Sequence, residues 1–310
     1  MCNGSIMDKL VSFALPLMLS GILQLMFNAV DIIVVGRFSG SEALAAVGST
    51  TALINVFTNL FIGISLGANV LAARFFAAGR KEEMSETVHT SITLALISGI
   101  LMAFVGLVFS KGALELMGTP EDVIGLSTLY MRIYFMGMPF FMLYNYGAAI
   151  LRAVGDTKRP LYFLIIAGVI NAGLNMVLVI VFGLGVAGVG IATVFSQMVS
   201  CVLVLTCLCR TEGSYKLSFS KLSMKGYYLK QIFQVGIPAG IQSTVINFSN
   251  ALLQSSVNSF GSTAMAGYTA ANNILGFLYV SINSVTQACM SFTSQNFGVG
   301  KYKRMDRVLI

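Results

Sequence analysis

The sequence has little charge, a single histidine and no tryptophan. Charged residues make up only 10% of its 310 positions. The one histidine, His89, lies beside a charged stretch, so neither a histidine-based catalytic triad nor a multi-histidine metal site is available. The five cysteines show neither zinc-like nor paired spacing, and we interpret them as small apolar residues. These absences argue against an enzyme and against a resident cofactor, and we predict neither.

Apolar residues dominate instead. Hydrophobic side chains account for 56% of the chain and the mean hydropathy is +0.83, which describes a protein surrounded by lipid rather than water. Windows of about 20 apolar residues recur along the chain. They cover about residues 10–35, 44–73, 88–109, 124–150, 160–182, 186–209, 229–257 and 265–297. These runs are too long and too unalternating for barrel strands, so we predict an all-α membrane protein with about eight transmembrane helices.

The net charge of +7 does not indicate a nucleic-acid partner, because the lysines and arginines lie between apolar runs rather than on one basic face. All but three of these 19 residues fall in alternate connections or beside the termini; the exceptions are Arg37, Lys111 and Arg132. Lysine and arginine in short loops prefer the cytoplasmic side. We therefore predict a multi-pass protein of the plasma or inner membrane, in contact with membrane lipid, whose two termini are cytoplasmic.

A polar, basic linker at residues 210–228 separates a six-helix N-terminal lobe, residues 1–209, from two further helices within residues 229–310. The segment after the linker repeats the start of the chain. The paired residues include Pro16 and Pro238, Asn28 and Asn250, Gly40 and Gly261, Ala43 and Ala264, and Gly79 and Gly300. Both copies start on the same side, which predicts two lobes in parallel repeat, the second of them incomplete. We expect this stretch of chain not to transport by itself.

One acidic residue, Asp31, lies inside an apolar segment, whereas the rest of the 12 lie in loops or near span ends. A charge near the centre of a membrane helix costs about 2.5–3.5 kcal/mol on insertion scales, so such a residue indicates a functional site. Ser20, Gln24 and Asn28 precede Asp31 at helical spacing on the same face. We predict that this face looks into a cavity; the alternative is that Asp31 only reaches the outer interface.

Amide and hydroxyl side chains in the fifth and sixth spans complete the predicted ion site. Asn171 and Asn175 are one turn apart in the fifth span, and Thr193 and Gln197 are one turn apart in the sixth. Oxygen atoms of this kind beside a carboxylate suit sodium or a proton, because hard cations prefer oxygen ligands. The predicted cation-coupling residues are therefore Asp31, Asn171, Asn175 and Thr193. The alternative is that these groups only hydrogen-bond to neighbouring helices.

Further polar residues are expected to line the cavity around that site. In the seventh span, amide side chains at helical spacing form one face without a carboxylate. The fourth span is rich in methionine and aromatic residues, which suit varied apolar cations. The predicted cavity-lining residues are Gln24, Asn28, Asn145, Gln197, Asn247, Asn250 and Gln254.

Two glycine patterns are structural in this context. Residues 183–188 have the G-x-G-x-x-G spacing of a dinucleotide-binding loop but join two membrane spans, so we predict a tight turn. The pairs Gly63 with Gly67 and Gly236 with Gly240 are predicted to be helix-packing contacts at most. Neither pattern indicates a cofactor.

Three segments resemble the multidrug and toxic compound extrusion (MATE) family. They are residues 16–48, which include the run ALAAVG, the segment ILRAVGDTKRP at residues 150–160, and the segment GLGVAGVGIAT at residues 183–193. The similarity extends over essentially the whole chain. It implies a two-lobed, V-shaped antiporter of twelve helices that exports small organic cations in exchange for sodium or protons.

The resemblance also implies roles for individual residues. In prokaryotic members of the family the coupling site lies in the N-terminal lobe, and its aspartate, asparagine and threonine match Asp31, Asn171 and Thr193. These three residues are then the candidate sodium ligands. Some members have a second acidic residue where this chain has Asn175, so the choice between sodium and protons stays open.

Two other functions stand as alternatives. A lipid-linked oligosaccharide flippase would share the architecture but have a more basic cavity, whereas the intramembrane charge here is acidic. An intramembrane enzyme would need clustered histidine, acidic or Ser–Lys groups, and the predicted spans offer none. We therefore expect a monomeric transporter of small organic cations.

Overall fold

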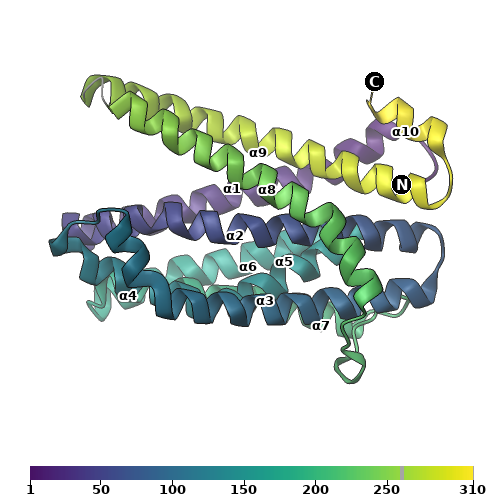
Figure 1. Ribbon diagram of the computed structural model, residues 1–310, viewed down its shortest axis with the longest axis horizontal. Coiled ribbons are helices and arrows are strands. Elements are labelled where there is room, and N and C mark those ends of the chain that lie inside the picture. The colour runs from purple at the N-terminus through teal and green to yellow at the C-terminus, as the bar shows by residue number, and fades with distance from the viewer. Residues whose placement is uncertain (259–261, 310) are drawn as a thin grey trace.

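Helices make up most of the residues that the computed structural model describes, which are 1–258 and 262–309 (Figure 1). Side chains are described in these helices except at residues 52, 247–248, 251–252, 254–255, 257–258, 262–270, 272–274 and 309. The helices are α1 (Ile6–Phe38), α2 (Gly40–Ala77), α3 (Lys81–Leu116), α4 (Glu121–Met136), α5 (Met138–Ala153), α6 (Lys158–Asn175), the π-helix η1 (Met176–Val181), α7 (Gly185–Arg210), the 3₁₀-helix η2 (Phe219–Lys221), α8 (Gly226–Asn258), α9 (Ser262–Gly298) and α10 (Tyr302–Leu309). The predicted all-α membrane class is confirmed. Within the described part of the chain, α1, α2, α3, α6 with η1, and α7 are long and apolar enough to cross a membrane.

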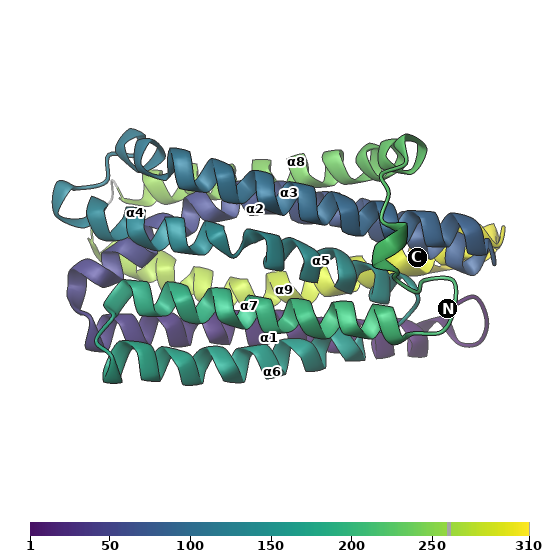
Figure 2. The same cartoon turned by 90° about the horizontal axis from the view of Figure 1, so that it is seen from below.

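The long helices run nearly side by side, and both termini lie at the same end of the molecule (Figures 1 and 2). We call this end the terminal end. The connections α2–α3, α5–α6, α7–α8 and α9–α10 also lie there. Most of the lysine and arginine of the chain lies in these connections, in the helix turns beside them or near the two termini. The basic connections therefore share one end of the bundle, as the alternation of charge along the sequence predicts.

The predicted span at residues 124–150 is interrupted, so the expectation of one continuous helix there is wrong. α4 ends and α5 begins on either side of Gly137. Pro139 lies in the first turn of α5, where a missing N–H is tolerated, but it cannot continue the hydrogen bonding of α4. α3 packs closely here, since a Cβ on Gly99 would collide with the backbone of Pro139.

The predicted span at residues 160–182 contains two kinds of helix. α-Helical hydrogen bonding extends to Asn175, and η1 continues as a π-helix from the next residue. π-Turns are frequent at functional sites. The chain then makes the tight turn predicted at residues 183–188, where two glycines adopt positive φ angles of 63° and 53°.

α8 packs on α2 through the predicted glycine pairs. Gly63 and Gly67 of α2 face Gly236 and Gly240 of α8. A Cβ on Gly63 would overlap the backbone of Gly240, and a Cβ on Gly236 would overlap the backbone of Ile64. The two helix backbones are therefore in direct contact, which confirms the packing role of both pairs. This contact joins the N-terminal lobe to the segment that follows the linker.

Buried hydrogen bonds also tie α9 to the N-terminal lobe. Ser291 donates to Asn69 Oδ1 of α2 at 3.0 Å, and Asn69 Nδ2 donates to the carbonyl of Ala149 in α5 at 2.8 Å. Gln295 donates to the carbonyl of Ala153 at 2.7 Å. Because these polar groups are buried, leaving any of them unpaired would be costly.

The N-terminal segment lies against the α9–α10 corner at the terminal end. Lys301 Nζ donates to the carbonyl of Cys2 at 2.9 Å and to Asn3 Oδ1 at 2.7 Å. Arg304 Nη2 donates to the carbonyl of Gly4 at 2.7 Å. These contacts are largely solvent-exposed, so each contributes less than the buried bonds between α9 and the N-terminal lobe.

The linker packs on α3 of the N-terminal lobe. The N–H of Ser218 donates to His89 Nε2 at 3.2 Å, and His89 Nδ1 lies 2.6 Å from the carbonyl oxygen of Ser85. These partners place the proton on Nδ1 and leave Nε2 as an acceptor. Lys225, just before α8, forms an ion pair with Glu86 at 3.4 Å. His89 Nε2 and Glu86 therefore hold the linker on α3, while the bond of Nδ1 to Ser85 fixes the tautomer of the ring.

Candidate functional site

Asp31 lies about two turns before the end of α1 and is half-buried. Its Oδ1 accepts a hydrogen bond from Nδ2 of Asn175 in α6. α1 and α6 approach closely because a glycine at position 168 leaves room for Phe27, whose ring a Cβ there would overlap. The structure therefore brings together two of the predicted cation-coupling residues from two different helices.

Asn171 and Asn175 are both buried on α6. Asn175 Nδ2 donates to Asn171 Oδ1 at 3.2 Å as well as to Asp31, so one amide group links the three side chains. Among the described residues, the buried Asn175 Oδ1 has no hydrogen-bond partner. An unpaired buried acceptor costs about 1–3 kcal/mol, so a bound cation or proton donor would be stabilised beside this oxygen.

The chemistry of this cluster suits a small hard cation or a proton. The carboxylate of Asp31 and the amide oxygens of Asn171 and Asn175 are ligand types that sodium accepts. Sodium coordination by Asn175 would require its Oδ1, rather than its Nδ2, to face the carboxylate. A proton would need only the carboxylate. The cluster therefore fits either ion.

Two tyrosines of α4 lie near Asp31, and neither is among the predicted site residues. Tyr130 and Tyr134 are within electrostatic range of its carboxylate. Their ring centroids are 6.2 Å apart. They lie one turn apart on α4, and a phenol suits a position where an apolar face meets a polar one. This spacing is a weak sequence signal, because it does not show that α4 lies near Asp31.

α7 contributes Gln197 and Thr193 in different ways. Gln197 Oε1 is buried, and a Cβ on Gly137 would come within 2.7 Å of it. Its side chain also interacts with Tyr134. The break between α4 and α5 therefore leaves room for Gln197. Thr193 donates to a carbonyl one turn earlier in α7 at 2.9 Å, and no described hydrogen bond links it to Asp31.

The remaining predicted cavity residues are spread along the helices. Gln24 and Asn28 are exposed on α1, and Asn250 is exposed on α8. Asn145 donates to a carbonyl one turn earlier in α5 at 2.8 Å. No described hydrogen bond joins these four side chains to the Asp31 cluster. Outside the described side chains lie Asn247 and Gln254.

The comparison with protein families is decisive for the identity of the fold. A family model described as MatE matches residues 16–177 and 238–310. The chain belongs to the MATE family. The two matched stretches of this MATE protein begin at Pro16 and Pro238, which the internal repeat pairs. The resemblance seen in the sequence is thus confirmed, and the chain is a multi-pass membrane transporter rather than an enzyme.

Related proteins match nearly all of this MATE chain. The protein named "Probable multidrug resistance protein YoeA" from Bacillus subtilis strain 168 is 33% identical, with 98% of this chain and 67% of the relative covered. A FAD transporter from Shewanella oneidensis is 24% identical, with 97% and 67% covered. The structure of a MOP superfamily transporter from Pyrococcus furiosus has a TM-score of 0.92 at 24% identity, with 99% and 68% covered. That likeness shows the shared fold. The chain spans about two thirds of the length of each.

Proposed function

We propose that this MATE protein exports small organic cations, drugs among them, in exchange for sodium ions or protons, and that ion and substrate compete for Asp31. The observation that carries the proposal is the membrane-embedded cluster of Asp31, Asn171 and Asn175. A carboxylate within a membrane helix lowers stability, so its presence indicates a functional role. The multidrug name of a relative at 33% identity supports drugs as the substrate class.

Exchange follows from the fact that a single carboxylate is present in the cluster. In the proposed cycle Asp31 is neutralised by sodium, by a proton or by an organic cation, because an unpaired charge in a poorly hydrated site is unfavourable. One carboxylate does not neutralise two cations, so binding of the coupling ion displaces the substrate. Because one positive charge enters for each monovalent cation that leaves, no net charge crosses the membrane, and the concentration gradient of the coupling ion drives the exchange with about 1.4 kcal/mol per tenfold difference.

Asn175 leaves the choice of coupling ion open. Because its amide is neutral, the cluster carries a single negative charge, that of Asp31. One proton or one sodium ion neutralises that charge. Reversal of the Asn175 amide would turn its Oδ1, which has no described hydrogen-bond partner, toward the carboxylate as a sodium ligand, whereas a proton needs no such change. Transport driven by an imposed sodium gradient, compared with an imposed proton gradient in vesicles, decides between the two ions.

We further propose a monomer of the plasma or inner membrane with the terminal end in the cytoplasm. The hydrogen bonds of Ser291, Gln295, Lys301 and Arg304 join the two parts of the molecule toward the terminal end. In Figure 1, α8 and α9 diverge from α2 and α3 toward the opposite end. This arrangement supports a state that is closed to the cytoplasm, and export then requires a second state in which these contacts separate.

A lipid-linked oligosaccharide flippase is the less favoured function. The pyrophosphate of its substrate would need a basic cavity. The charged group in the described Asp31–Asn171–Asn175 cluster is instead a carboxylate, that of Asp31. Uptake of an organic cation and of the anionic FAD molecule, measured side by side in the same vesicles, separates a cation exporter from a transporter of anions.

The test of the proposal is Asp31→Asn in the full-length protein, reconstituted in vesicles with an imposed sodium or proton gradient. The amide preserves the side-chain shape and removes the charge, so the fold is retained while gradient-driven transport falls at least tenfold. The matched control is Glu42→Gln, an exposed carboxylate in the first turn of α2, which keeps transport. Concentration of substrate by Asp31→Asn under either gradient would remove Asp31 from the mechanism.

A further inference from the structure

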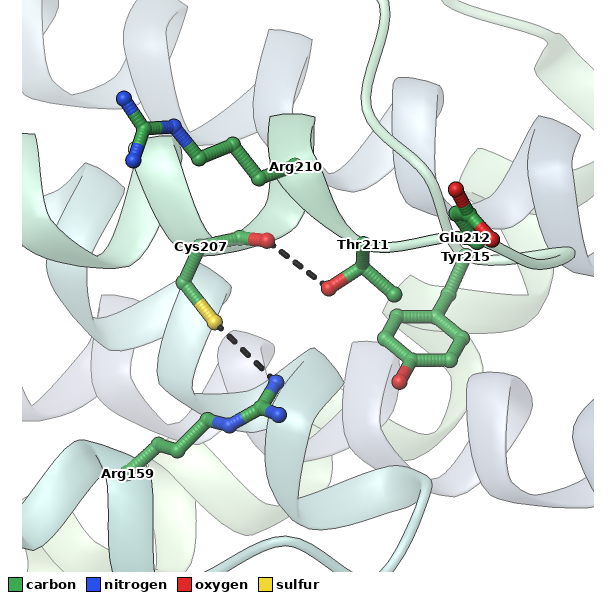
Figure 3. A pocket seen from close by; sticks show the side chains of 6 residues that line it. All are labelled: Arg159, Cys207, Arg210, Thr211, Glu212 and Tyr215. Carbon is green, nitrogen blue, oxygen red and sulfur yellow. Dashed lines mark hydrogen bonds between the residues drawn. The ribbon is translucent and has the colours of Figure 1, made fainter.

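A cavity of about 500 Å³ opens at the terminal end, between the start of α6, the end of α7 and the linker (Figure 3). Asp31 lies in the other half of the bundle, near the far end of α1. The cavity is therefore separate from the proposed transport site. Its lining residues are Arg159, Cys207, Arg210, Thr211, Glu212 and Tyr215.

The lining is polar and has more positive than negative charge. Figure 3 shows Arg159 pointing into the cavity toward Cys207, with the tyrosine ring on the opposite wall. Arg159 Nη1 donates to Cys207 Sγ at 3.5 Å, and Arg159 Nε pairs with Asp156 at 3.2 Å. A guanidinium has five N–H donors, so these two contacts leave donors for an anion. Arg210, whose guanidinium points away from Arg159 in Figure 3, adds a second cation at the rim, against the single lining carboxylate of Glu212.

Each of the two arginines stands at the end of an exposed apolar helix face. On α6, Tyr162, Ile166 and Val169 follow Arg159 at helical spacing and are 57%, 46% and 66% exposed. α7 carries a similar exposed face that precedes Arg210. Its members are Ile191, Phe195 and Val202. In a bilayer such exposed faces contact acyl chains, so a cavity with two arginines and room for a phospholipid headgroup adjoins two lipid-covered surfaces.

We propose that this cavity binds the headgroup of an anionic phospholipid, with its phosphate on Arg159, Arg210 adding positive charge at the rim, and its acyl chains along α6 and α7. Arginine matches phosphate geometry with paired N–H donors. Basic pockets between membrane helices on the cytoplasmic side are typical headgroup sites. The residues next to the lining in the sequence add two lysines, Lys158 and Lys216, and one carboxylate, Asp156, so the local charge stays positive. A soluble phosphate would use the arginines but not the apolar faces.

Occupancy of the cavity would also restrain the transport cluster. A phosphate on Arg159 would lie between the first turn of α6 and the last turn of α7, where Arg159 already donates to Cys207. α6 carries Asn171 and Asn175 further along its length. Lipid binding itself does not depend on the transport activity proposed for Asp31, so the two proposals fail separately.

The experiment uses the full-length protein in neutral detergent with phosphatidylglycerol, phosphatidylcholine or inorganic phosphate as the added probe. Native mass spectrometry measures lipid binding, and thermal unfolding measures the stabilisation that it produces. Phosphatidylglycerol is expected to raise the melting temperature more than phosphatidylcholine. The double variant Arg159→Gln/Arg210→Gln should bind phosphatidylglycerol at least tenfold more weakly. The control Arg80→Gln, an exposed arginine at the same end that pairs with Glu83, should bind it normally.

A second variant tests the charge balance without removing the arginines. Glu212→Gln deletes the one lining carboxylate, which is exposed on the linker, so phosphatidylglycerol should bind more tightly. A general loss of folding cannot produce that gain. Unchanged phosphatidylglycerol binding in the arginine double variant would overturn the proposal. Stabilisation by inorganic phosphate equal to that by phosphatidylglycerol would also overturn it, in favour of a soluble anion.

Discussion

Two helix pairs that the internal repeat relates, α2 with α8 and α1 with α9, are packed in different ways. The α2–α8 pair meets backbone to backbone through four glycines. The corresponding positions of the α1–α9 pair are Ala14, Met18, Ser284 and Ala288. There, Gly21 of α1 meets the side chain of Val280 rather than a backbone. A repeated sequence has therefore produced one close contact and one contact mediated by side chains.

This difference matters because α1 carries Asp31. Where glycines bring two backbones into contact, no side chain can change rotamer to absorb a shift, so one helix can move only together with the other. Side chains can change rotamer, so the α1–α9 contact tolerates small shifts of α1. We expect the α2–α8 pair to stay together during transport while α1 moves relative to α9. Substitutions at the two contacts test that expectation.

The largest effect is expected at the α2–α8 contact. Gly63→Val places two methyl groups where the Gly240 backbone lies, and the separation of the helices should cost at least about 3 kcal/mol. Thermal unfolding and size-exclusion chromatography measure the loss. Gly48→Val is the matched control, since Gly48 lies on the same helix with open space around it. Equal stability of the two variants would show that the backbones are not in contact.

A smaller effect is expected at the α1–α9 contact. Gly21→Val should destabilise the protein by about 1–2 kcal/mol, because a Cβ there overlaps only the side chain of Val280. The compensating change Val280→Ala should recover most of that loss, and a double-mutant cycle measures the recovery. If Val280→Ala gave no recovery, the two helices would not be packed through this side chain.

The smallest effect is expected at the terminal end. Arg304→Ala removes the hydrogen bond to the Gly4 carbonyl, and an exposed contact of this kind contributes about 0.2–1 kcal/mol. The N-terminal segment should loosen, so Cys2 should react faster with a maleimide, as followed by peptide mass spectrometry. Lys303→Ala, exposed on the same short helix, is the control. Equal labelling rates in the two variants would show that Arg304 does not hold the segment.

The sequence predicts the parts of this fold that depend on composition and spacing. Apolar runs locate the spans, and the glycine pairs at positions 63, 67, 236 and 240 identify packing faces, although only the structure shows that they meet each other. Pro139 indicates the helix break at Gly137, but the mean hydropathy over residues 124–150 hides the effect of a single proline. No sequence signal indicates the π-helix after Asn175, because its residues are ordinary apolar ones.

The sequence predicts the charged residue of the candidate site more directly than the uncharged residues around it. Asp31 stands out because it is the one carboxylate within an apolar run, and the structure joins it to Asn175. Tyr130 and Tyr134 are harder to detect, because tyrosine is common in apolar spans and only the fold brings α4 near α1. Asn69, which bonds to α9, is another buried polar residue whose partner lies far away in the sequence.

The attachment of the linker has a mechanical consequence for the helix that follows it. The Lys225–Glu86 ion pair fixes the chain on α3 one residue before α8 begins. α8 has 33 residues and is therefore about 50 Å long. Because α2 and α8 stay together, the pair acts as one lever with its fulcrum at the terminal end, and a rotation of about 10° there would displace the far tip of α8 by about 9 Å. A small angular change beside the linker is thus amplified into a large displacement on the opposite side of the membrane.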